Sequence, residues 1–270
     1  MAKSVAPSVL VIVSDTHCGG ATALCPPRFD ESRDTPDGRE CRAFLWEAWK
    51  RFANHWLPGR LGGRPYTLVV NGDCIEGLHH DRAQILTTSL PRQWRMFRDT
   101  LAVLPPRHTL YVVEGTRVHV LDDEAEIAEE MGATPDPHGR YAWKRLSLVL
   151  GGKAVSIRHH IGTTGRPWLE ANQLGMTLAA ERLAAVNAGE RPTDILVAAH
   201  RHIGGYARTD SGLAICTPSW QFPTRFVFKI NPSARMVCGA TLLDFDDPDG
   251  SGFPRVWEFR QSPGGGNRAA

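Results

Sequence analysis

Five short clusters of Asp and His residues give this chain its clearest capacity for chemistry. They are Asp15-Thr16-His17, Gly72-Asp73, Gly115-Thr116 with His119 close behind, His159-His160 and His200-Arg201-His202. Carboxylate oxygens and imidazole nitrogens are common ligands of divalent metal ions. On extended backbone, the first and third residues of Asp-x-His or His-x-His lie on the same face, so one ion can take both side chains. Together, the clusters predict a metal centre.

Each cluster ends a run of apolar and β-branched residues, and such runs predict buried strands. The five strands are expected within residues 8–17, 66–73, 108–116, 153–162 and 193–202. Helical spacing predicts helices between them, over residues 40–56, 82–104, 123–131 and 168–188. Alternation of strand and helix predicts an α/β sheet, in which ligands bind beyond the carboxyl ends of the strands. All five clusters are therefore expected to meet at one edge.

The pattern changes after His202. Three shorter runs, LAICTPS, MVCGATLLDF and PRVWEFR, are separated by Gly, Pro and Asp, which predicts an antiparallel half without helices. We expect one domain over residues 1–262 and a disordered tail over residues 263–270. Residues 19–38 are rich in Pro, Gly and charge, which predicts an inserted loop that is either a lid over the site or a solvated surface excursion.

Composition narrows the class of protein. The 270 residues are 42% hydrophobic, which is typical of a globular chain. The formal net charge is only +2, so the protein as a whole is not expected to be drawn electrostatically to nucleic acid or to anionic membranes. No apolar run could span a bilayer and the N-terminus lacks a signal-peptide pattern, so a cytoplasmic location is expected. The six cysteines include no Cys-x-x-Cys pair, which favours reduced thiols. Trp46, Trp49 and Trp56 recur at helical spacing and are expected in the core.

In this order, the clusters resemble the five sequence blocks of the calcineurin-like metallophosphoesterase family, and the sequence looks like a divergent bacterial or phage-type member. Those blocks read Asp-x-His, Gly-Asp, Gly-Asn-His, His and Gly-His-x-His, and the resemblance covers about residues 8–205. It implies a four-layer sandwich of two mixed β-sheets flanked by helices. It also implies two divalent metal ions, with Mn first and Fe, Zn, Ni or Mg as alternatives.

The resemblance assigns roles residue by residue. The six metal ligands would be Asp15, His17, Asp73, His159, His200 and His202. Asp73 would bridge the ions, and His159 could exchange its role with the adjacent His160. Residues near the ligands that could support them or bind substrate are Thr116, His160, Arg117, Glu76 and His79. Arg201 is a further candidate for gripping phosphate.

One block departs from the family pattern. The sequence has Thr116 where the family has Asn, and its histidine is delayed to His119. A hydroxyl is a weaker ligand than an amide oxygen, so the second ion is expected to be looser or differently ligated. His119 is the candidate general acid for the leaving group.

The implied activity is hydrolysis of a phosphate ester by a metal-activated hydroxide. A phosphodiester such as a nucleotide or nucleic acid ranks first and a phosphomonoester second. The Gly72-Asp73 block lacks the Asp-Arg-Gly continuation of the family's protein phosphatases, which lowers phosphoproteins in rank. Two alternatives stay open: a metal-dependent hydrolase with another substrate, and a catalytically weakened member that serves as a binding or scaffold module. Protein partners and oligomeric state are not encoded in these motifs.

Overall fold

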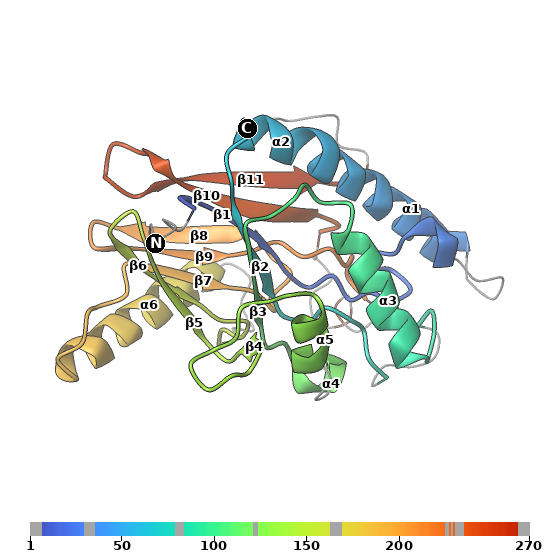
Figure 1. Cartoon of the computed structure of the whole chain (residues 1–270), viewed down its shortest axis with the longest axis horizontal. Coiled ribbons are helices and arrows are strands. Elements are labelled where there is room, and N and C mark those ends of the chain that lie inside the picture. Colours follow the sequence, from blue (N-terminus) through green and yellow to red (C-terminus); the bar gives the residue numbers. More distant parts are fainter. Residues whose placement is uncertain are drawn as a thin grey trace, which may run out of the picture.

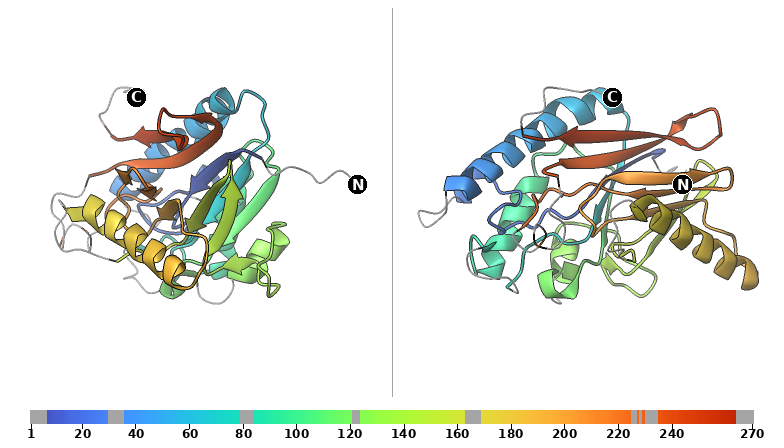
Figure 2. Two further views of the ribbon diagram at one scale, coloured as in Figure 1. Left: turned by 90° about the vertical axis from the view of Figure 1, so that its left-hand side faces the viewer. Right: turned by 180° about the vertical axis from the view of Figure 1, so that it is seen from behind.

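Two β-sheets lie face to face, and helices cover their outer faces (Figures 1 and 2). The computed structural model describes residues 7–29, 36–78, 84–120, 124–162, 169–224, 227, 229 and 235–263. The predicted α/β architecture, with two mixed sheets flanked by helices, is confirmed. Within the described residues, no helix is both long and apolar enough to cross a membrane.

The first sheet has the strand order β11-β10-β1-β2-β3-β4. Its strands are β1 (Val9–Val13), β2 (Thr67–Asn71), β3 (Thr109–Val113), β4 (Ala142–Trp143), β10 (Cys238–Pro248) and β11 (Pro254–Gln261). Strands β1 to β4 run parallel, and β10 is antiparallel to both of its neighbours. Every residue of β1 and β2 is buried, which explains why β1 is apolar throughout and why β2 is apolar between its end residues, Thr67 and Asn71.

The second sheet has the order β5-β6-β7-β9-β8. Its strands are β5 (Leu146–Leu150), β6 (Lys153–Ile157), β7 (Ile195–Ala198), β8 (Gly205–Thr209) and β9 (Gly212–Cys216). Strands β6, β7 and β9 are parallel, and each edge strand is antiparallel to its neighbour.

The strands after His202 form two antiparallel hairpins, as predicted, but these hairpins do not make up one half of the molecule. Hairpin β8–β9 joins the second sheet and hairpin β10–β11 joins the first. Strand β9 is buried along its whole length and pairs in parallel with β7. A fully buried strand needs partners for its backbone on both sides, and β7 and β8 supply them.

Side chains alternate between the two faces of each sheet. In β1, Leu10 and Ile12 point between the sheets, while Val9, Val11 and Val13 face the outer helices. The helices that cover the first sheet include α1 (Pro36–Arg51) and α3 (Leu90–Leu101), together with the short α4 (Arg117–Val120) and α5 (Glu124–Glu130). Helix α6 (Glu170–Asn187) covers the second sheet through Leu174 and Leu178.

Two helices differ from the predictions in where they begin and end. The helix expected to end at Trp56 continues through a π-helical turn (Phe52–Trp56) into α2 (Leu57–Leu61). Pro58 cannot donate a backbone hydrogen bond, and the wide turn just before it accommodates that loss; the helix then ends at Gly62, with φ 57°. Helix α3 begins at Leu90, later than expected, because Pro91 suits the first turn.

Core predictions for the aromatic residues hold. Trp49 is fully buried, and Trp46 and Trp56 pack against the same cluster. All six cysteines are free.

The segment after the first cluster is packed where it is described. Ala21 and Leu86 donate backbone hydrogen bonds to Gln84 and Gly19, and Ala23 forms a bridge to Gln221. A short 3-10 helix follows (Pro27–Phe29). Residues 30–35 lie outside the described residues, and residues 36–38 already belong to α1. The same holds for most of the predicted tail, residues 264–270.

Candidate metal centre

The five clusters meet at the carboxyl ends of β1, β2, β3, β6 and β7. Asp15 and His17 donate backbone hydrogen bonds to the carbonyls of Gly72 and Asp73, at 3.1 and 3.0 Å, which ties the first cluster to the second. Ala199 donates to the carbonyl of His159 at 2.9 Å, which ties the fourth cluster to the fifth. The sheet hydrogen bonding thus continues past the strand ends and holds the polar side chains together.

Backbone strain is concentrated at these clusters. Among the described residues, those other than glycine with positive φ are Asp15 (50°), His17 (44°), Asp73 (49°), His200 (69°) and His202 (54°). A side chain in this region is uncommon and costs on the order of 1–3 kcal/mol. All five are residues singled out from the sequence as metal ligands. Favourable interactions elsewhere in the fold therefore offset the free-energy cost of orienting these side chains.

One group of side chains forms around Asp15. Its Oδ1 lies 3.2 Å from Nε2 of His202 and 3.9 Å from Nε2 of His17. The two imidazole Nε2 atoms are 3.2 Å apart. One ligand atom from each of the three side chains lies within 4.8 Å of the others, so a single ion could contact all three.

A second group forms around Asp73. Its Oδ2 lies 3.0 Å from Nε2 of His159 and 3.8 Å from Nδ1 of His200. His159 is almost fully buried, and its Nδ1 lies 2.7 Å from the carbonyl of Asn71, which orients the ring. His160 is exposed, with its ring 4.6 Å from that of His200. His159 thus faces both carboxylates, whereas His160 lies at the rim beside His200.

Two buried polar atoms test whether this site suits a metal ion. Oδ1 of Asp15 and Nε2 of His159 lie 3.9 Å apart; each has a charged neighbour, His202 at 3.2 Å and Asp73 at 3.0 Å, but neither makes a hydrogen bond of standard geometry. Leaving such atoms unsatisfied costs about 1–3 kcal/mol each. A divalent cation would satisfy both, and the mixed carboxylate and imidazole set fits ions such as Mn, Fe or Zn. The residues present fit a metal centre.

The electrostatics of the site follow from burial and close opposite charges. Burial opposes ionisation of Asp15, but His202 and His159 lower its pKa to about 2. Burial also opposes ionisation of Asp73, yet His159 and His200 hold its pKa well below the ordinary value. Burial lowers the pKa of His17 to about 3. Both carboxylates are therefore ionised at neutral pH, and His17 is neutral, the forms that bind metal.

Thr116 lies where the family pattern has Asn. Its backbone N–H donates to Oδ1 of Asp73 at 2.5 Å, and its hydroxyl donates to Oδ2 at 3.2 Å. The same hydroxyl lies 3.3 Å from Nδ1 of His200. Thr116 therefore connects Asp73 to His200 at the position expected for the second ion.

The delayed histidine also reaches the site. Nδ1 of His119 lies 2.8 Å from the carbonyl of Glu76, and its Nε2 lies 4.0 Å from Oδ2 of Asp73. Its ring meets that of His17 edge to face, with centroids 4.5 Å apart. Burial and the neighbouring His17 lower the pKa of His119 to about 4. Two residues, Arg117 and Val118, separate Thr116 from His119. They form the start of helix α4, and this helical turn places the His119 ring beside the Asp and His cluster.

Glu76 supports His17 from behind. Its Oε2 lies 3.1 Å from Nδ1 of His17 and accepts a hydrogen bond from the amide of Gln221 at 2.7 Å. A carboxylate on the outer nitrogen of a ligating histidine fixes the ring and its tautomer. The sequence singled out Glu76 but not Gln221, which belongs to no motif and arrives from a distant segment.

Glu124 is a second residue that sequence reasoning missed. This buried side chain on α5 accepts a hydrogen bond from Gly115 N–H at 2.9 Å and one from the Cys74 thiol at 3.4 Å. Glu124 therefore links Cys74, which follows Asp73 of the second cluster, to Gly115 of the third cluster. An acidic residue in an acidic helix carries no local signal for such a role.

The remaining candidates lie at the margin. Arg117 is exposed at the start of α4, and Arg201 is half-buried between His200 and His202. His79 lies outside the described residues.

Comparisons with known proteins give similarity only at the level of solved structures. No family model matches the chain, and neither does any curated protein. A Vps29 single mutant from Entamoeba histolytica matches with 14% identity and a TM-score of 0.40, over 94% of this chain and 99% of that one. A novel archaeal phosphodiesterase matches with 11% identity and a TM-score of 0.45, over 93% and 99%. Vps29 from Chaetomium thermophilum matches with 14% identity and a TM-score of 0.44, over 94% and 97%. These are likenesses of fold, so function has to be argued from the side chains of the site.

Proposed function

We propose that this protein is a dinuclear metal-dependent phosphoesterase, a divergent member of the calcineurin-like family. The observation that carries the proposal is the position of the Asp73 carboxylate. Its Oδ2 lies 3.8 Å from His17 Nε2, 3.0 Å from His159 Nε2 and 3.8 Å from His200 Nδ1. One carboxylate thus faces imidazoles of both groups, as a bridging ligand would.

The ligand sets follow from the two groups. Asp15, His17, Asp73 and His202 would hold one ion, and Asp73, His159 and His200 would hold the other, with Thr116 beside it. Bound there, two divalent ions would neutralise phosphoryl oxygens and make a water molecule nucleophilic near neutral pH. Mn is the ion we would test first, since oxygen and nitrogen ligands accept several metals.

The chain's own residues would orient the reaction. Thr116 holds Asp73 through its N–H and hydroxyl, and the Asn71 carbonyl holds the His159 ring. His119 is proposed as the proton donor to the leaving oxygen. Its ring is fixed by the Glu76 carbonyl, and an anionic substrate nearby would raise its low pKa.

A phosphodiester is the proposed substrate class. The carboxylates form a buried floor, whereas the His202 and His200 side chains are 21% and 31% exposed and His160 is exposed. The centre is thus open on the side of the second sheet, where a second ester group could lie. Phosphomonoesters are the alternative within the same chemistry.

A binding or scaffold role is the second candidate, and Thr116 favours it. Its hydroxyl already pairs with Asp73 and His200, and it replaces a stronger amide ligand. A weakened second ion would leave the fold and the first ion intact while reducing catalysis.

Metal titration separates these proposals. Metal-free protein would receive Mn²⁺ in steps while hydrolysis of bis-p-nitrophenyl and p-nitrophenyl phosphate is followed. We expect two equivalents to bind, and diester hydrolysis to require them. Asp73→Asn should abolish hydrolysis, whereas the matched change Asp210→Asn, at an exposed turn, should not. Two bound equivalents without turnover of either ester would favour the scaffold role. Binding of a single equivalent would indicate that Thr116 has weakened the second metal site.

A further inference from the structure

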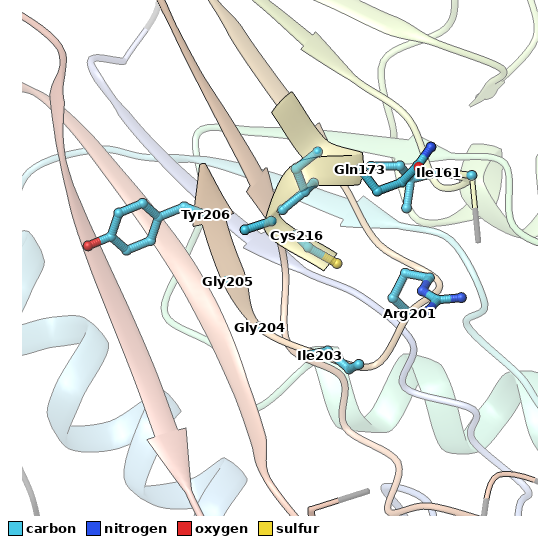
Figure 3. Close-up of a pocket in the computed structure, with 11 residues that line it drawn as sticks. Ile161, Gln173, Arg201, Ile203, Gly204, Gly205, Tyr206 and Cys216 are labelled. Atoms are coloured by element: carbon cyan, nitrogen blue, oxygen red, sulfur yellow. The ribbon is translucent and has the colours of Figure 1, made fainter. Parts of the chain in front are cut away.

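A pocket of about 250 Å³ lies beside the metal centre, at the carboxyl end of the second sheet (Figure 3). Its walls come from α6, the start of β8, the end of β9 and the segments that follow β6 and β7. Apolar contributors include Ile161, Leu174, Ile203 and Cys216, and polar ones include Gln173 and Arg201. In Figure 3, the Cys216 thiol points toward Arg201 and Ile203, whereas the Tyr206 ring points the other way.

The pocket and the metal centre share the same two segments. Ile161 directly follows His160, and Arg201 stands between His200 and His202. The rings of His160 and His200 lie 4.6 Å apart. The Cys216 thiol donates to the Ala199 carbonyl, at 3.9 Å, just before His200. A substituent of a phosphate ester held at the metal centre could therefore extend into the pocket.

The size and lining of the pocket indicate what it would hold. Ile161, Leu174 and Cys216 belong to the buried apolar cluster under α6. A cavity of about 150 Å³ lined by apolar residues holds benzene, so this pocket has room for a larger ring. A guanidinium group stacks on flat aromatic surfaces, and a glutamine amide can both donate and accept hydrogen bonds.

We propose that this pocket binds a planar aromatic group, of aryl or nucleobase size, carried by the phosphate ester substrate. The inference rests on the proposed function, because it assigns the substituent of that substrate. It adds that aromatic esters are preferred over alkyl esters, and that the preference is set by residues outside the metal centre.

Gly205 offers a direct test. It is paired with Cys216 across strands β8 and β9, so the two residues point to the same face of the sheet. A Cβ at Gly205 would have no heavy atom within 4 Å, and its φ does not lie in the left-handed region. Gly205→Leu should therefore fill the pocket without disturbing the strand. Thr209→Leu places the same side chain at the far end of β8, on the same face, as the matched control.

The first measurement is the affinity of Mn²⁺-loaded protein for phenylphosphonate and for methylphosphonate, by calorimetry. Both probes resist hydrolysis, and they differ only in the ring. We expect phenylphosphonate to bind at least about tenfold more tightly in the wild type and in Thr209→Leu. The ratio should fall toward one in Gly205→Leu. Equal affinities in the wild type, a ratio that Gly205→Leu leaves intact, or no binding of either probe would each overturn the inference.

Ester hydrolysis, measured alongside, distinguishes failure of the inference from failure of the proposed function. The expected affinity ratio without hydrolysis of bis-p-nitrophenyl phosphate would support the pocket and refute the phosphoesterase. Hydrolysis with equal affinities for the two phosphonates would support the phosphoesterase and refute the pocket.

Discussion

The Nε2 atom of His159 lies 3.0 Å from Oδ2 of Asp73, and both side chains are almost completely buried. Burial alone would lower the pKa of His159, but Asp73 and Asp15 raise it to about 9. In the metal-free protein, His159 is therefore protonated at neutral pH, and the proton occupies the position that we assign to a metal ion.

Metal binding should accordingly release a proton. Below pH 9, an ion has to displace the His159 proton, so apparent affinity should rise by about tenfold per pH unit for each proton released, from pH 7 to pH 9. Calorimetric titration with Mn²⁺ in buffers of different ionisation enthalpy measures the release. We expect about one proton or more, since the pKa of His202 is also raised, by Asp15 against the effect of burial. A binding enthalpy that is independent of the buffer would contradict the arrangement.

Glu124 should make the stability of the metal-free protein depend on pH. Burial raises its pKa from 4.5 to about 7. Since the folded state holds this proton more tightly than the unfolded state, the associated stability is fully present below pH 4.5. It is lost as pH rises through 7, and the shift corresponds to roughly 3 kcal/mol.

Glu124→Gln would remove this dependence while keeping an acceptor for the Gly115 N–H. Urea unfolding between pH 4.5 and 8 should show the wild type losing stability relative to the variant. Glu126→Gln, an exposed change on the same helix, should run parallel to the wild type. If the wild type and Glu124→Gln lose stability in parallel, Glu124 is not the titrating group.

Gly72 should tolerate no side chain, for a reason specific to the site. It has φ 77°, and a Cβ there would lie 2.3 Å from Nδ1 of His159 and 2.8 Å from the Gly115 Cα. Gly62 has a similar φ, 57°, but open space around it. Gly62→Ala should cost about 1–2 kcal/mol of unfolding free energy, from backbone strain alone. Gly72→Ala should cost clearly more, and metal affinity should fall with it. Equal losses in the two variants would show that His159 is not confined by Gly72.

His119→Ala should discriminate between leaving groups. A nitrophenolate departs without a proton, whereas an alkoxide needs one. The variant should therefore keep its turnover of nitrophenyl esters and lose about 10²–10⁴-fold on alkyl esters. Steady-state kinetics on matched nitrophenyl and alkyl diesters measure the two effects. An equal loss on both would reject the acid role and indicate that His119 mainly holds His17 in place.

Much of the fold was predictable because its signals are local. Buried parallel strands need continuous apolar runs, and this chain shows five of them, each ending in Asp, Gly or His. The helix over residues 40–56 was predicted in type but not in length, because the π turn that passes Pro58 has no signature in spacing. The pairing of β9 with β7 was missed, since strand partners that are not joined by a tight turn are chosen by burial.

The sequence by itself determined the polar residues at the strand ends and the order in which they occur, because those are properties of short segments. Only the tertiary structure decided which of them face one another: that Asp73 lies among His17, His159 and His200, and that His119 returns to the centre. Only the structure, too, brought Glu124 and Gln221 beneath the site. Such contacts join segments up to 145 residues apart, and they depend on sheet packing and left-handed backbone at the ligands, which no local pattern specifies.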